Sequence, residues 1–401
     1  MGSVPGFRVL IIGGGMYGHF QLSSSKFPYI DDRYLRPGFS TRFGTGMLLH
    51  WGKEFLMSIL PPELQARFDE TLADPWYKGG DGIPHVNGAT GEVLGRVVMP
   101  GLVRVSRKKM RNFLTSDGRL NISFGKRLVT VESDGTTATA YFEDGSTESG
   151  NLIIGCDGSR SKVREFLVGK AASQPQETGM TLINHAFSGY TAEQALSFRR
   201  LHQVGTCAYH PDVHGIFLLT IVDAADQAKP ENWKFQIHHA WFGAPFAQDL
   251  KEPKARLDFL RQRFSQLCEP FATAANALPD DTVLPVDPGQ QWSPISWDNR
   301  NGTVTIAGDA AHPMLPNRGQ GLNNAIQDAA ELMGAIGAVV SGASSLNDAV
   351  TAYEVSMRPR GARDVALSSE TAKKCRIEDV LSGPMFKVGL NKVNGQDADE
   401  R

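Results

Sequence analysis

Two glycine-rich stretches carry the residue types and spacings that point most directly to chemistry. Gly13, Gly15 and Gly18 form a G-x-G-x-x-G pattern immediately after the apolar run at residues 8–12. The first glycine permits a tight turn, the second allows the backbone to approach a pyrophosphate, and the third lets a helix pack closely on the strand. The pattern predicts a bound dinucleotide whose phosphates face a helix N-terminus. A glycine-rich turn without a ligand is the alternative.

An acidic residue is expected about 20 residues after such a loop, where it binds the ribose hydroxyls. Asp31 and Asp32 lie at roughly that distance, after the short run at residues 27–30. We take Asp32 as the candidate. A surface turn containing both aspartates is the competing interpretation, because the intervening stretch carries three serines, which are poor helix formers.

The second stretch joins Gly308-Asp309 to Gly319-Gln320-Gly321, and it is the more specific signal. A buried strand at residues 303–307 precedes it, and one helix over residues 321–340 is predicted to follow it. An aspartate at the end of a strand can accept hydrogen bonds from a polyol. Glycines at a helix N-terminus let N–H groups approach an electron-rich ring carbonyl. A flavin nucleotide offers both groups, so the stretch indicates FAD.

These motifs, together with the mid-chain segment CDGSRSKVR at residues 156–164, resemble the FAD-dependent monooxygenases of the aromatic hydroxylase type. The resemblance covers residues 8–340. It implies that Asp157 lies near FAD and the nicotinamide donor, that Arg107 contacts FAD, and that Leu322 follows the loop over the flavin. For Arg107 the alternative is a solvated arginine on a basic helix face. Arg160, Lys162 and Arg164 are interpreted as an exposed basic helix start.

The stretch LLHWG at residues 48–52 is similar to one in fungal members that modify secondary metabolites. The segment at residues 18–31 is several residues shorter than in the family. Two alternatives to a working monooxygenase therefore stay open. One is a flavin oxidase or dehydrogenase on the same fold, and the other is an inactive homologue with a shortened nucleotide site.

Composition excludes several other classes of protein. Lys plus Arg number 41 and Asp plus Glu 43, so no net field favours nucleic acid. The cysteines, Cys156, Cys207, Cys268 and Cys375, lack the paired spacing of zinc sites or redox dithiols, and reduced thiols are expected. No apolar run reaches the roughly 20 residues of a membrane span. No targeting signal is visible, so a cytoplasmic location is expected.

The elements that must position these motifs predict an α/β fold. It consists of a Rossmann-like (βαβ) FAD-binding domain, an inserted β-sheet substrate domain and C-terminal helices. The FAD-binding domain is expected over residues 1–168 and 299–342, the substrate domain over 169–298, and a helical tail over 343–401. Helices are predicted at residues 104–114 and 255–271. A hairpin is predicted around Asp134-Gly135, and residues 38–52 are predicted to be irregular.

The predicted reaction uses NADPH or NADH to reduce FAD, and O2 to hydroxylate or epoxidise an electron-rich small organic molecule. No motif fixes a catalytic residue or an oligomeric state, and no metal site is predicted. His238 and His239 are adjacent in a strand-like run and would point to opposite faces, which argues against a metal ion shared between them. The residues considered as possible cavity groups are His185, Tyr209, His210, His238, His239 and Trp241.

Overall fold

The structure is a computed structural model of the chain. It describes residues 7–13, 44–79, 82–97, 101–116, 121–383 and 386, and the backbone of residues 28–31. In this part of the chain no helix is long and apolar enough to cross a membrane. Cys156, Cys207, Cys268 and Cys375 are all free, as expected from their spacing.

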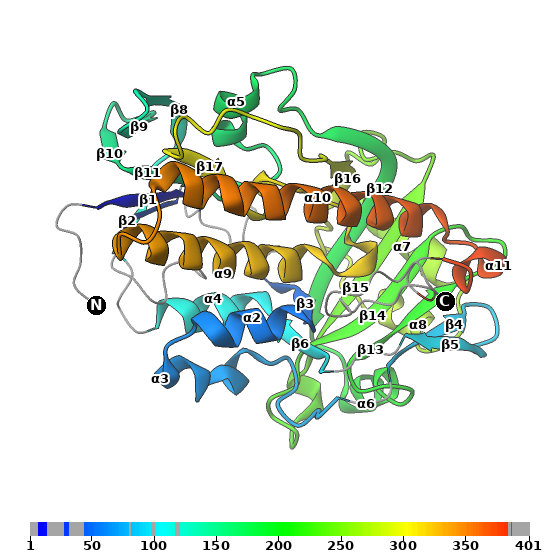
Figure 1. The fold of residues 1–401 in the computed structure, drawn as a ribbon. Helices are drawn as coiled ribbons and strands as arrows, with labels where there is room; N and C mark the ends of the chain where they lie inside the picture. Colours follow the sequence, from blue (N-terminus) through cyan, green and yellow to red (C-terminus); the bar gives the residue numbers. More distant parts are fainter. Residues whose placement is uncertain are drawn as a thin grey trace.

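A five-stranded sheet with the order β17-β11-β1-β2-β7 forms the base of the first layer (Figure 1). Every neighbouring pair in it is parallel. Three neighbouring strands read VTI, LIIG and VLII and are buried throughout, as parallel strands covered on both faces require. Its strands are β1 (Val9–Ile12), β2 (Pro28–Asp31), β7 (Asn121–Phe124), β11 (Leu152–Gly155) and β17 (Val304–Ile306).

Side chains from this sheet share one apolar core with a small antiparallel sheet and with two long helices. Gly135 has a φ of 84° in the turn between β8 and β9, which confirms the hairpin predicted there. The antiparallel sheet contains β8 (Leu128–Ser133), β9 (Ala138–Phe142) and β10 (Thr147–Gly150), and α5 (Lys162–Val168) lies beside it.

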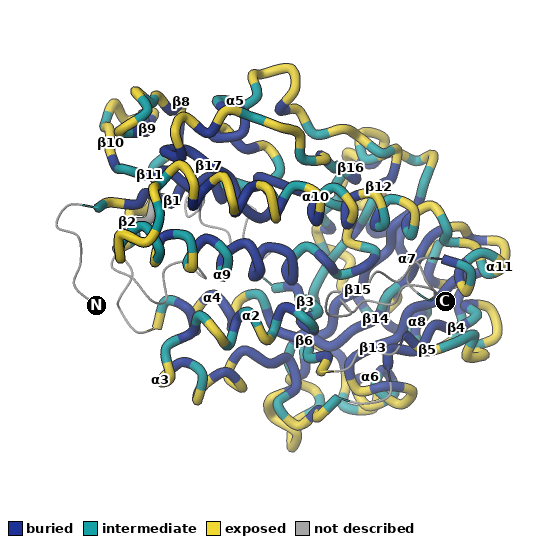
Figure 2. The backbone as a smooth tube through the Cα atoms, in the orientation of Figure 1, coloured by how far each residue is buried: buried dark blue, intermediate teal, exposed yellow. Residues whose placement is uncertain are grey.

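The two long helices are α9 (Gly321–Val340) and α10 (Leu346–Lys373), which run antiparallel after a short turn (Figure 1). Figure 2 shows α9 as the more deeply buried of the two. The Tyr353 hydroxyl of α10 donates to the carbonyl oxygen of Ile306 in β17 at 3.0 Å, so α10 belongs to the same core. The chain continues into α11 (Ile377–Val380).

A third group of elements packs on the opposite side of α9 (Figure 1). An antiparallel ribbon of two strands lies at its end, next to the start of α9. The group contains β3 (Gly46–Leu49), α2 (Gly52–Ile59), α3 (Pro62–Gln65), η3 (Phe68–Thr71), β6 (Val103–Ser106) and α4 (Arg107–Thr115).

A seven-stranded sheet with the order β16-β12-β15-β14-β13-β4-β5 forms the second layer. Ile183, Phe217 and Ile237 pack on one face against α6, α7 and α8, whereas alternate residues such as Leu218 lie on the opposite face of the sheet. The strands are β4 (Ile83–Asn87), β5 (Val93–Val97), β12 (Gln176–Ser188), β13 (Gly205–Tyr209), β14 (Ile216–Asp223), β15 (Lys234–Phe242) and β16 (Val286–Gln291). The helices are α6 (Ala192–Phe198), η4 (Pro230–Asn232), α7 (Pro253–Phe264) and α8 (Phe271–Asn276).

The predicted fold class is confirmed, and the helix over residues 321–340 is present with those bounds. Three local predictions were wrong. Residues 103–106 form a strand, because they pair with β3, and the helix begins only at Arg107. Within the span predicted to be irregular, residues 46–49 form β3. The helix predicted over 255–271 is two helices, separated around the cis peptide bond before Pro270.

The predicted domain limits remain a prediction. Two observations bear on how the chain is shared between layers: β4 and β5 come from the first 168 residues but complete the seven-stranded sheet. Residues 343–401 include α10, which packs on α9.

Candidate functional site

The site is built at the carboxyl ends of the parallel strands, where Gly13 follows β1. Gly13 has a φ of 111°, and a Cβ atom there would lie 2.5 Å from the Cα atom of Asp157. Only glycine therefore allows the turns after β1 and β11 to approach so closely. The backbone of β2 ends alongside at Asp31. Gly15, Gly18 and Asp32 lie outside the described residues, so their predicted roles remain predictions.

Asp157 follows β11 and binds the first turn of α5. Its carboxylate accepts hydrogen bonds from the Ser161 hydroxyl at 2.5 Å and from the backbone N–H groups of Lys162 at 2.6 Å and Val163 at 3.3 Å. Burial raises the pKa of this carboxyl group, and the hydrogen bonds act in the opposite direction. Asp157 thus fixes the turn beside Gly13.

Arg164 connects this turn to the second glycine-rich stretch. It is fully buried, so the prediction of an exposed helix start was wrong for Arg164, whereas Arg160 and Lys162 are exposed as predicted. Its guanidinium lies over the Trp292 ring at 4.7 Å and donates to the carbonyl oxygens of Ala310 at 2.8 Å and Ser173 at 2.9 Å. Burial lowers the pKa of Arg164 to about 10, so it stays charged at neutral pH. It holds η5 (Gly308–Ala310) against the mid-chain motif.

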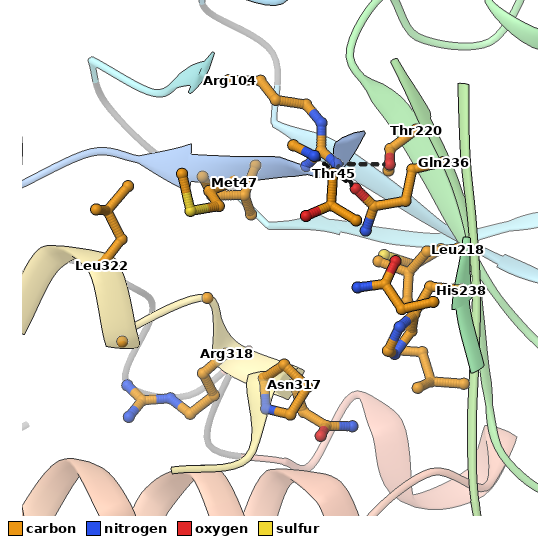
Figure 3. A pocket seen from close by; sticks show the side chains of 18 of the residues that line it. Thr45, Met47, Arg104, Leu218, Thr220, Gln236, His238, Asn317, Arg318 and Leu322 are labelled. Carbon is orange, nitrogen blue, oxygen red and sulfur yellow. Dashed lines mark hydrogen bonds between the residues drawn. The ribbon is translucent and has the colours of Figure 1, made fainter. Parts of the chain in front are cut away.

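A cavity of about 290 Å³ brings four of the predicted FAD residues together (Figure 3). Arg107, Asp309, Gly321 and Leu322 all line it, although they come from three separate parts of the chain. The wall on their side is completed by Thr45, Gly46, Met47, Leu48, Met314, Leu315, Pro316, Asn317, Arg318 and Gly319.

The start of α9 suits an electron-rich ring. Gly319 has a φ of 63° at the end of η6 (Pro316–Arg318), and no side chain caps the first turn of α9. Gly321 and Leu322, in that turn, line the cavity. A 20-residue helix concentrates partial positive charge at this end, which favours a ring carbonyl or a developing negative charge. These residues fit the pyrimidine side of a flavin.

Asn323 fixes the distance between this helix end and the ribbon of β3 and β6. Its side-chain oxygen accepts from the N–H groups of His50 and Gly52, each at 3.1 Å. Its Nδ2 donates to the carbonyl oxygen of Leu48 at 3.2 Å. A planar ring between Leu48 and Leu322 would therefore be held between two elements that are bonded to each other.

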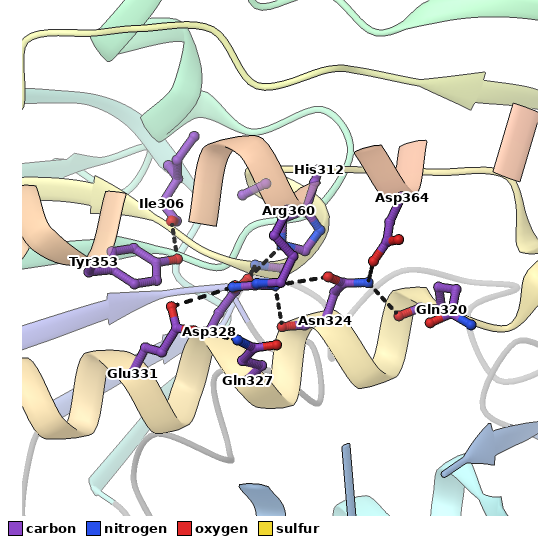
Figure 4. A network of polar contacts seen from close by, with 12 residues as sticks. Ile306, His312, Gln320, Asn324, Gln327, Asp328, Glu331, Tyr353, Arg360 and Asp364 are labelled. Carbon is purple, nitrogen blue, oxygen red and sulfur yellow. Dashed lines mark hydrogen bonds and ion pairs between the residues drawn. The ribbon is translucent and has the colours of Figure 1, made fainter. Parts of the chain in front are cut away.

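A buried ionic network between α9 and α10 binds the loop that begins at Gly308 (Figure 4). Asp328 accepts from the Gly308 N–H at 2.8 Å, from His312 Nε2 at 2.6 Å and from Arg360 Nη2 at 2.6 Å. Arg360 also donates to the Asn324 side chain at 2.8 Å. Burial would raise the pKa of Asp328, but the charges of His312 and Arg360 lower it well below its usual range. Sequence reasoning missed this network, because its α10 members are far from every motif.

The opposite wall of the cavity is one row of residues across the seven-stranded sheet. The pairing registers place Asn184, His238, Leu218, Cys207 and His85 side by side on five neighbouring strands. All five line the cavity. Burial lowers the pKa of His85 to about 3, while burial and the charge of Arg104 lower that of His238 to about 4. Both imidazoles are therefore neutral at neutral pH.

Of the six residues considered as possible cavity groups, His238 is the one that lines this cavity. His239 lies on the other face of β15, where its ring stacks between those of Phe217 and Trp241. The ring centroids lie 4.1 Å and 4.8 Å from that of His239. Tyr209 does not line the cavity, but its hydroxyl lies 3.1 Å from Nδ1 of His85, which does. His85, Asn184 and Arg104 were not predicted as site residues, because only strand pairing brings them to the cavity.

A parallel sheet with this glycine turn, a Gly-Asp loop and an uncapped helix start, facing a second sheet across a cavity, defines an FAD-binding fold with a substrate layer. Comparison with known proteins agrees. Residues 103–368 match the family described as FAD binding domain. The chain is 36% identical to the FAD-dependent monooxygenase cctM of Talaromyces islandicus, over 86% of each chain. It is 31% identical to the FAD-dependent monooxygenase phnB of Penicillium herquei, over 98% of this chain and 97% of that one.

The fold also matches solved structures. HpxO of Klebsiella pneumoniae, complexed with FAD and uric acid, superposes with a TM-score of 0.72 at 19% identity, covering 96% of this chain and 93% of that one. The chain belongs to the FAD-dependent monooxygenases of the aromatic hydroxylase type, which confirms the resemblance seen in its motifs.

Proposed function

We propose that the protein uses NADPH or NADH and O2 to hydroxylate or epoxidise an electron-rich small organic molecule in secondary-metabolite biosynthesis. The observation that carries this proposal is the two-sided cavity. Predicted FAD residues line one wall, and a row of sheet residues lines the other. The fungal monooxygenases at 36% and 31% identity support the metabolic role.

Bound FAD would supply the acceptance of two electrons from the nicotinamide and the activation of O2. The residues that would hold it are assigned from the motifs, and the cavity lining supports four of them. Gly13, with Gly15 and Gly18, would face the pyrophosphate, Asp32 the ribose, and Asp309 the ribityl hydroxyls. Arg107, Gly321 and Leu322 would contact the ring, and Asp157 would set the turn beneath the phosphates.

The chain's own contribution to oxygen transfer is placement and exclusion of water. The sheet wall offers apolar surface at Leu218 and Ile216 and neutral polar groups at His238 and Asn184. Because both histidines of the row are uncharged, neither would protonate a reactive oxygen species at neutral pH. A cavity lined in this way would orient the carbon that is attacked and limit the access of water to it.

Labelled oxygen distinguishes this proposal from its alternatives. The FAD-loaded protein would be incubated with NADPH, an ¹⁸O2 atmosphere and a panel of small phenols, and the products analysed by mass spectrometry. One ¹⁸O atom in the product is the expected result. Substrate oxidation without ¹⁸O incorporation would identify an oxidase or dehydrogenase. Absence of flavin binding would identify an inactive homologue.

A further inference from the structure

Arg104 of β6 places a buried positive charge at the substrate side of the cavity (Figure 3). Its side chain is only 6% exposed. Nε donates to the carbonyl oxygen of Ile221 at 2.5 Å, and Nη2 donates to the Thr220 hydroxyl and the Gln236 side-chain oxygen, each at 2.8 Å. All three acceptors are neutral, and Nη1 takes part in none of these bonds.

Within the described ranges, no carboxylate forms an ion pair with Arg104. Other buried arginines near the site have carboxylates close by: Arg360 pairs with Asp328 at 2.6 Å, and Arg318 lies 3.7 Å from Asp364. Arg164 donates to carbonyl oxygens, but the charges of Asp157 and Asp309 favour its charged form. Burial lowers the pKa of Arg104 to about 10, which leaves the guanidinium charged at neutral pH. A buried charge without a counter-ion is costly, and proteins keep one where a ligand supplies the opposite charge.

The neighbouring strand is built to make room for this guanidinium. A Cβ atom on Gly46 would lie 2.6 Å from Nε and 2.8 Å from Nη2 of Arg104. Gly46 is not in the left-handed region of φ, so its backbone does not demand glycine. Its N–H donates to the same Gln236 oxygen at 2.8 Å that Arg104 uses. Gly46 and Gln236 together fix where the charge points.

The hydrogen bonds of Arg104 place it on the cavity wall formed by the seven-stranded sheet rather than on the wall formed by residues 308–322. Its partners come from β14 and β15, the strands that also carry Leu218 and His238. His238 lies two residues after Gln236 on the same face of β15, about 7 Å along the strand. The neutral His238 and its cross-strand neighbour Asn184 can bind a second polar atom of the same ligand, but cannot offset the charge.

Resting on the proposed function, we infer that Arg104 is a specificity-determining residue which binds the substrate as an organic anion. The anionic oxygen, a carboxylate or a phenolate, would lie against Arg104, and a polar substituent would face His238 and Asn184. An anion of this kind supplies the charge that none of the described carboxylates brings to Arg104 as an ion pair. The remainder of the ligand would lie over Leu218 and Cys207.

Calorimetric titration of the FAD-loaded protein with benzoate and with benzamide tests this inference, because the two probes have nearly the same shape and differ in charge. The native protein is expected to bind benzoate roughly 10- to 150-fold more tightly than benzamide, since a hydrogen bond to a charged group is worth about 1.5–3 kcal/mol. In Arg104→Gln this preference should disappear. In Gly46→Ala it should fall, because the added methyl group displaces a guanidinium that remains present.

Arg256→Gln is the matched control. Arg256 also donates only to neutral acceptors, the carbonyl oxygens of Leu250 at 2.7 Å, Leu284 at 3.0 Å and Lys251 at 2.8 Å, but it does not line the cavity. Its replacement should leave the preference for benzoate intact.

A phenolate is tested in the same way with 4-nitrophenol, whose ionised form has its own visible absorption band.

Equal binding of benzoate and benzamide by the native protein, or binding of neither, would overturn the inference. So would an Arg104→Gln variant that retains the preference while its flavin reduction potential shifts, because Arg104 would then serve the flavin. The flavin spectrum is recorded in every titration. Loss of anion preference with FAD still bound therefore reports on Arg104, whereas absence of FAD reports failure of the proposed function itself.

Discussion

Asp309 is the residue through which the Gly-Asp loop is expected to hold the cofactor. It lies after β17, lines the cavity and acts electrostatically on Arg164. Replacement of Asp309 by Ala should weaken FAD binding by about 1–3 kcal/mol, roughly 5- to 150-fold, because hydroxyl groups of the cofactor lose a charged acceptor. Flavin fluorescence titration measures this. Asp281→Ala, at an exposed position, should leave FAD affinity unchanged, and equal loss in both variants would argue against the assignment.

Gly13 allows the turn after β1 to approach the backbone of Asp157. Gly13→Ala should reduce the free energy of unfolding by about 2–5 kcal/mol, through a positive φ and overlap with the backbone of Asp157. Gly145 has a φ of 81° with open space around it, so Gly145→Ala should cost only about 1–2 kcal/mol. Urea unfolding compares the two variants. Equal losses would mean that the close approach after β1 is not needed.

The helix pair α9 and α10 holds the loop that begins at Gly308 in place through Asp328. Asp328→Asn would remove the anion that Arg360 and His312 share, leaving Arg360 only the longer contact with Glu331 at 3.5 Å, so the free energy of unfolding should fall by about 3–5 kcal/mol. Thermal unfolding checks this. Asp348→Asn, at the exposed start of α10, is the control and should cost less than about 1 kcal/mol. A smaller effect at Asp328 than at Asp348 would contradict the supporting role of the network.

The elements that could be predicted from sequence are those whose pattern is unambiguous. The continuous apolar runs of β1, β11 and β17 indicate buried parallel strands, and the Ala- and Leu-rich α9 indicates one helix. The site residues that these elements carry, Gly13, Asp309, Gly321 and Leu322, were predicted with them.

Other parts depend on tertiary partners. In VRVSRKKM the helical spacing of the later residues hid a short strand, and with it Arg104. The alternation Val103, Arg104, Val105, Ser106 is the signal that could have shown it. The polar face of α10, with Pro359 inside the helix, resembles a solvated tail until Asp328 and Asn324 are placed opposite it. Residues His85 and Asn184 reach the cavity only through the strand order.

At the scale of the whole molecule, five histidines with lowered pKa values predict a loss of stability in mild acid. Burial lowers them to about 3 or 4, against 6.5 in the unfolded chain. Their contribution is full above pH 6.5 and declines as the pH falls towards 4, because the unfolded chain then binds protons that the folded one excludes. They are His50, His85, His185, His238 and His239.

Urea unfolding at a series of pH values measures this linkage, with each unit of pKa separation worth about 1.4 kcal/mol per group. His238→Gln should flatten the decline, whereas replacement of the exposed His214 should not alter it. A free energy of unfolding that is constant between pH 6.5 and 4 would show that these side chains are not buried as neutral groups.

The two layers meet at the cavity, and we propose that FAD bound there exchanges electrons with a nicotinamide and with oxygen. The most direct test is the visible absorption spectrum of the purified protein during titration with FAD, followed by addition of NADPH, first without and then with air. We predict a protein-bound flavin band that NADPH bleaches and air restores. A protein that shows no bound flavin at saturating FAD, or a bound flavin that NADPH and NADH both leave oxidised, would contradict the claim.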